Sequence, residues 1–62
     1  MTPDEERWAE ALAVERIHGA DAPRYVAERI GALALAGDQA GIDRWKEIAS
    51  RLDQLSRGPR HL

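Results

Sequence analysis

Apolar residues recur along this 62-residue chain at the spacing of three to four positions that places them on one side of an α-helix. The most apolar stretch runs from Ala22 to Ala36, in the middle of the chain, and its inner stripe contains Val26, Ile30 and Leu33. The segments on either side have the pattern of amphipathic helices. Their apolar sides therefore need the middle segment as a packing partner.

The residues that start and stop helices divide the chain into predicted helices at residues 3–18, 22–36 and 39–56. Helix starts are indicated by capping residues and by prolines in a first turn, and helix ends by glycines. The residues that give these signals are Thr2, Pro3, Glu5, Gly19, Asp21, Pro23, Gly37 and Asp38. Because the turns between these helices are short, sequential helices are expected to run antiparallel.

The pattern predicts an all-α fold, a compact three-helix bundle that forms one domain over residues 1–56 and continues into a flexible tail at 57–62. The third helix has the cleanest separation of apolar and charged sides. The two tryptophans are assigned to the core, one from each outer helix. The predicted core residues are Trp8, Leu12, Ile17, Val26, Ile30, Leu33, Trp45, Ile48, Leu52 and Leu55.

A chain of this length forms at most one domain, and the core of so small a domain rarely supplies more than roughly 3–5 kcal/mol of stability. Many small domains add disulfides or a metal, but the sequence has no cysteine. Disulfides, thiolate zinc sites and thiol chemistry are therefore excluded. Tight helix packing or self-association is left as the source of additional stability.

The first residues are acidic and show neither the basic region nor the apolar region of a signal peptide. The longest uncharged run, Ile30 to Gly37, is far shorter than the ~20 residues that span a bilayer. We therefore expect a cytoplasmic protein that does not enter a membrane.

Charge is distributed unevenly, although the net charge of −2 disfavours nonspecific binding to nucleic acid. Residues 1–21 hold six acids against two arginines, a net charge of −4. Residues 44–62 hold five basic residues against two acids, a net charge of +3. The first and last segments are therefore expected to attract each other, within one chain or between two.

One pair of residues has a spacing found in metal proteins. Glu15 and His18 lie one turn apart, as in carboxylate-bridged di-metal bundles, and Glu28 could supply a further ligand in a dimer. In the alternative interpretation, Glu15 is paired with an arginine and His18 is exposed at the helix end. Glu15 and Arg29 are the candidates for such a structural ion pair, unless both are solvated.

The sequence contains no credible serine–histidine–acid set and no glycine-rich phosphate loop. We therefore expect a protein that is not an enzyme, and we assign no catalytic residue, cofactor or metal. An alternative is DNA binding through the third helix and the basic tail, with Arg57 and Arg60. The acids of the third helix oppose phosphate, so nucleic acid is the less favoured partner.

Several large apolar side chains exceed what one small core can hide. They are Val14, Tyr25, Leu35 and Ile42, and they are the candidate partner contacts. Because no reactive constellation accompanies them, we expect a protein–protein interaction or self-association module. Its partner would be another protein or a second copy of the chain.

Three stretches also support a resemblance: RWAEALAVERIHG at 7–19, AERIG at 27–31, and GDQAG at 37–41 followed by Trp45. With this pattern the chain resembles a family of short alphaproteobacterial proteins classed as a domain of unknown function. The resemblance covers about residues 7–55. It implies a small bacterial helical protein and supplies no activity, substrate or site residue.

Overall fold

The structure is a computed structural model that describes residues 1–57. Its elements are helix α1 (Pro3–His18), the 3-10 turn η1 (Gly19–Asp21), helix α2 (Ala22–Ala36) and helix α3 (Gln39–Arg57). Over the described residues the all-helical prediction is confirmed. The predicted helix bounds also hold, except that α3 continues to Arg57. The rest of the predicted tail, 58–62, lies outside the described residues.

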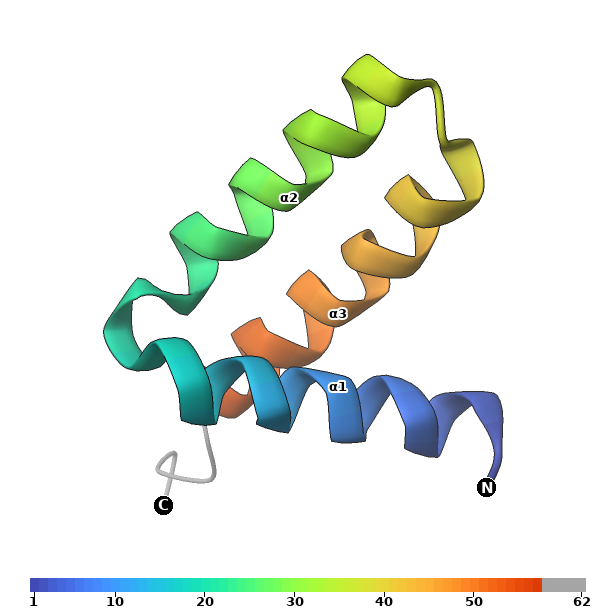
Figure 1. Cartoon of the computed structure of the whole chain (residues 1–62). Coiled ribbons are helices and arrows are strands. Elements are labelled where there is room, and N and C mark those ends of the chain that lie inside the picture. Colours follow the sequence, from blue (N-terminus) through green and yellow to red (C-terminus); the bar gives the residue numbers. More distant parts are fainter. Residues whose placement is uncertain (58–62) are drawn as a thin grey trace.

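Helices α2 and α3 lie side by side and run in opposite directions, and α1 lies across this hairpin (Figure 1). Helix α1 contacts α3 more extensively than it contacts α2. The prediction of antiparallel neighbours is therefore right for α2 and α3 and wrong for α1 and α2. The turn η1 redirects the chain between these two helices, so that α1 crosses the hairpin instead of running along it.

The start of α1 is fixed by a reciprocal capping box. The Thr2 hydroxyl accepts a hydrogen bond from the Glu5 backbone N–H at 3.2 Å, and the Thr2 N–H donates to Glu5 Oε1 at 2.8 Å. Two backbone donors that the helix leaves open are thereby satisfied. Acids in the first turn also complement the positive end of the helix dipole. The capping signature read from the sequence is confirmed.

The turn between α2 and α3 combines a helix stop with a helix start. Gly37 adopts the left-handed conformation at φ 72°, which glycine reaches without steric cost. Its N–H donates to the Ala34 carbonyl at 3.1 Å, and the Asp38 N–H donates to the Leu33 carbonyl at 3.0 Å. This is a Schellman motif. Asp38 Oδ1 then caps α3 by accepting the Gly41 N–H at 2.9 Å, so one residue closes α2 and opens α3.

The core of residues 1–57 is small. Its buried residues are Ala11, Val14, Ala22, Val26, Ile48 and Leu52. The partly buried residues packed against it are Tyr25, Ile30, Trp45, Ala49 and Leu55. Among the described residues, only Ile48 is both large and fully buried. The predicted core residues of α2 and α3 therefore belong to this core, except Leu33, which is half-buried and lies outside it.

The predicted core face of α1 is wrong. Leu12 is 45% exposed and Ile17 is 75% exposed, whereas Ala11 and Val14 are buried. Trp8 is half-buried. Because α1 crosses α3, the two backbones approach closely at the crossing, and small side chains fit there better than large ones. Val14, predicted as a partner contact, therefore belongs to the core.

Candidate interaction groove

A groove of about 510 Å³ lies along the hairpin of α2 and α3 and is closed at one end by η1 and the last turns of α1. We call it the hairpin groove. Its lining residues are Glu15, Gly19, Ala20, Ala22, Pro23, Val26, Ala27, Ile30, Ala49, Leu52, Asp53 and Ser56. The lining is mostly apolar. Removing this surface from water is favourable, so a partner that covered it would gain free energy.

Small side chains create this groove. Ala22 and Ala27 on α2 and Ala49 on α3 leave the space between the two helices unfilled on this side. The larger Ile30 and Leu52 form parts of its wall. Two helices packed side by side leave grooves along the contact, and a further helix can place its side chains in them. The shape and the apolar character of the hairpin groove suit a helix as its occupant.

Charge on the groove lies at one end. Glu15 comes from the last turns of α1, and Asp53 comes from the last turns of α3. Because α2 and α3 are antiparallel, the end of α3 lies beside the start of α2 and η1 (Figure 1). Both carboxylates therefore flank the end of the groove nearest η1. Asp53 also pairs with Arg57 at 2.9 Å, and both of these side chains are exposed.

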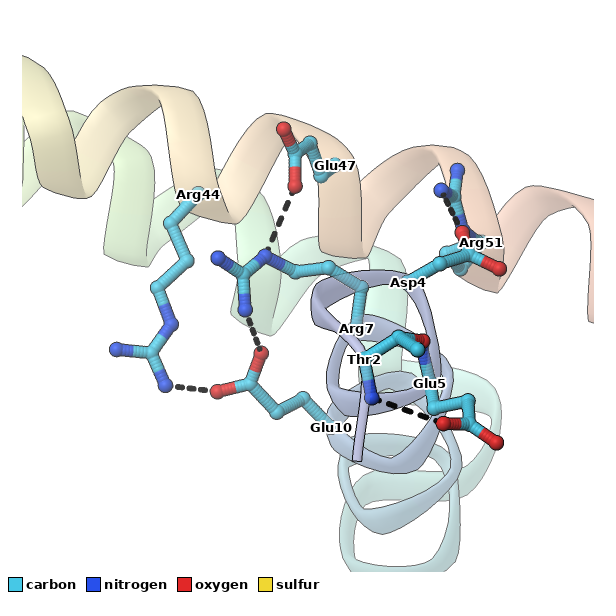
Figure 2. A network of polar contacts seen from close by, with 8 residues as sticks. All are labelled: Thr2, Asp4, Glu5, Arg7, Glu10, Arg44, Glu47 and Arg51. Atoms are coloured by element: carbon cyan, nitrogen blue, oxygen red, sulfur yellow. Dashed lines mark hydrogen bonds and ion pairs between the residues drawn. The ribbon is translucent and has the colours of Figure 1, made fainter.

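Another side of α3 is covered by α1 and carries a network of ion pairs. Figure 2 shows α1 almost along its axis while α3 runs across the view, so the two helices cross steeply. Arg7 donates to Glu10 at 3.0 Å and to Glu47 at 2.9 Å, and Glu10 also accepts from Arg44. The predicted attraction between the acidic first segment and the basic last segment is confirmed within one chain.

Arg51 combines an ion pair with an aromatic contact. It donates to Asp4 Oδ1 at 2.6 Å, and its guanidinium carbon lies 5.4 Å from the centre of the Trp8 ring. Its Nε is buried and has no hydrogen-bond partner within residues 1–57. The ring face therefore supplies part of the attraction for this cation. Because Arg44 and Arg51 are engaged by acids of α1, α3 presents less positive charge to a nucleic acid than its sequence suggests.

Aromatic rings join all three helices at a second place. The rings of His18 and Tyr25 stack at 3.8 Å, and Tyr25 meets Trp45 edge to face at 5.9 Å. Arg29 lies over the Trp45 ring at 5.3 Å. No ion pair joins Arg29 to Glu15 in the described part of the chain, so the candidate structural pair is not formed. Arg29 is positioned instead by the aromatic ring.

The proposed di-metal set is also not brought together. His18 is held against Tyr25, Glu15 is exposed at the groove, and Glu28 is exposed on α2. Within residues 1–57, no three or more histidine, cysteine, aspartate or glutamate side chains gather in a way that could hold a metal ion. Within one chain the described residues do not assemble this set, and a site shared between two copies stays a prediction.

The candidate partner contacts lie in different places. Leu35 is 93% exposed near the end of α2. Tyr25 is half-buried in the aromatic stack, Ile42 is half-buried in α3, and Val14 is buried. Large exposed residues do not mark the hairpin groove. Its signal in the sequence is the alanines of α2 and α3, whose small side chains cannot fill the space between two helices.

Within residues 1–57, none of the helices combines the length and the apolar character needed to cross a bilayer.

Comparisons with known proteins give a family and no relative of known function. No curated protein and no solved structure matches the chain. The model of a family described as "Family of unknown function (DUF6961)" matches residues 3–59. Because this match covers nearly the whole sequence, the chain belongs to that family.

Proposed function

We propose that this chain is a non-enzymatic docking module that binds an apolar helix face in the hairpin groove. The observation that carries the proposal is the groove itself, an open apolar channel of about 510 Å³ between α2 and α3. In this proposal the role of the groove is contact and not catalysis. The expected cytoplasmic location would put such a partner inside the cell.

The energetics of the fold support an occupant. Only six residues of the described chain form the buried core, and two of them are alanines. Each Å² of apolar surface that a partner removes from water contributes roughly 25 cal/mol before the costs of association. A groove that is already formed needs little rearrangement to bind, which lowers that cost. Ile30, which is half-buried, is the large apolar side chain of the lining that a partner would contact, because Leu52 is only 6% exposed.

Site-specific photo-crosslinking in the native host tests the proposal. A photoreactive residue replaces Ala27, which is exposed and lines the groove. The matched control carries the same residue at Ala32, which is exposed on the same helix and outside the groove lining. We expect discrete crosslinked protein products from position 27 and none above background from position 32. Equal yields at the two positions, or no product at position 27, would refute docking in the groove.

A further inference from the structure

We infer that the occupant of the hairpin groove is a second copy of this chain. The two copies face each other through their grooves, related by a two-fold axis, with their α3 helices antiparallel and crossing near Ala49 and Ser50. This inference rests on the proposed docking function and names its partner. It requires that the groove face be complementary to itself, because the same surface is used twice.

The charges along α3 have this self-complementarity. Lys46 and Asp53 are seven residues apart, which is two helical turns, so they lie on the same side of α3. Their midpoint falls between Ala49 and Ser50. When two copies of α3 cross antiparallel at that midpoint, Lys46 of each copy faces Asp53 of the other. A parallel arrangement would instead place lysine against lysine and aspartate against aspartate.

The second acid of the groove fits the same arrangement. Glu15 flanks the groove at the end where Asp53 lies. In the antiparallel dimer this end receives Lys46 of the second copy, so one lysine meets two carboxylates. Asp53 is available for the exchange because its pair with Arg57 is a surface contact, with side chains 60% and 74% exposed. Exposed pairs of this kind are weak and are readily replaced.

A dimer interface would extend beyond the groove lining onto the neighbouring surface of α2 and α3. A stable interface removes about 800 Å² from each partner. That area is less than a fifth of the 4504 Å² accessible surface of one chain. Ala27 and Ala49 allow the helices of a second copy to approach closely, and the half-buried Ile30 supplies a larger apolar side chain at the contact. The dimer would thereby enlarge the small core around Ile48.

Sedimentation equilibrium of the full chain over a wide range of concentrations tests the inference, with circular dichroism to show that each variant is folded. We expect a dimer of twice the 6.9 kDa chain mass. Ala27→Glu places two carboxylates in the apolar interface of each dimer and should raise the dissociation constant by more than about 100-fold. Ala32→Glu, outside the lining, should change it by less than about threefold.

A charge swap tests the antiparallel arrangement. Lys46→Asp and Asp53→Lys each convert two attractive contacts into repulsive ones and should each weaken the dimer about tenfold. The double variant restores opposite charges between positions 46 and 53 and should bind more tightly than either single variant, although the new carboxylate at position 46 is repelled by Glu15 and keeps the dimer weaker than the original. A double variant no stronger than the single variants would overturn the arrangement.

Two further results would overturn the inference. One is a monomer at every concentration. The other is a dimer that tolerates Ala27→Glu but is lost in Leu35→Glu, which would place self-association at the exposed end of α2. A monomer whose position 27 still crosslinks to a different protein would refute the second copy and leave the docking function standing. A monomer without groove crosslinks would refute both.

Discussion

Replacing a helical glycine by alanine should increase the stability at one position of this chain and not at another. Gly31 lies inside α2, and a Cβ added there meets nothing within 4 Å. Gly41 lies in the first turn of α3, and a Cβ there would come within 2.7 Å of Asp38 Oδ2 and 2.9 Å of Leu33 Cδ2. Glycine costs about 1 kcal/mol relative to alanine in a helix interior. The surroundings of each glycine decide whether this gain is realised.

The expected free energies follow from these contacts. Gly31→Ala should raise the free energy of unfolding by about 1 kcal/mol, which is about 4–8 °C in melting temperature for a domain of this size. At Gly41 the added methyl pushes the Asp38 carboxylate away from the N–H that it caps. Loss of an aspartate cap costs about 1 kcal/mol. Because alanine gains less in a first turn, Gly41→Ala should be neutral or destabilising by up to about 1 kcal/mol.

A double-mutant cycle isolates the cause. In an Asp38→Ala background the cap and its clash are both absent and only the contact with Leu33 Cδ2 remains, so Gly41→Ala should be less destabilising than in the original chain. The coupling energy between the two sites should be about 1 kcal/mol. Urea unfolding followed by circular dichroism at one fixed protein concentration gives these values, provided that the m-values agree. A Gly41→Ala variant as stabilised as Gly31→Ala, with no coupling to Asp38, would refute the steric argument.

Three other substitutions test the core and the α1 contacts by the same unfolding measurement. Ile48→Val should cost about 0.5–1.5 kcal/mol, whereas Ile17→Ser, at a site 75% exposed, should change stability by less than about 0.5 kcal/mol; equal effects would contradict the assigned core. Glu10→Gln should cost about 0.5–1 kcal/mol, a difference that shrinks at high salt, while Glu28→Gln should be neutral. A salt-independent loss would show that the ion pairs do not stabilise α1. Thr2→Ala should cost about 1 kcal/mol, and no loss would mean that the capping box is unimportant.

The positions of the helices were predictable because their starts and ends are local chemistry. Thr2 with Glu5 caps α1, and Gly37 with Asp38 ends α2 and starts α3. These signals act within a few residues and do not depend on the tertiary structure. The inner side of α3 was predictable for a different reason. Its apolar and charged residues are well separated, so only one side can face a core.

The packing of α1 was not predictable from the same pattern. Apolar residues occur around most of its circumference, so periodicity does not single out one side. Choosing the side with large residues favoured Leu12, but the crossing with α3 selects Ala11 and Val14. The position of Arg29 over Trp45 likewise depends on the path of the chain after α1. The groove is not predictable from the apolar pattern, because it is the space that small side chains leave unfilled between two helices.

Helix α1 is attached to the rest of the fold by few buried contacts, so it should unfold locally before the other helices. This helix contributes only Ala11 and Val14 to the buried core, and its other cross-helix contacts include ion pairs that salt weakens. The hairpin of α2 and α3 keeps its own turn and its mutual packing when α1 separates. Amide protons of α1 should therefore exchange with solvent through partial openings that need less free energy than global unfolding. Ionic strength would set how often such openings uncover Ile48.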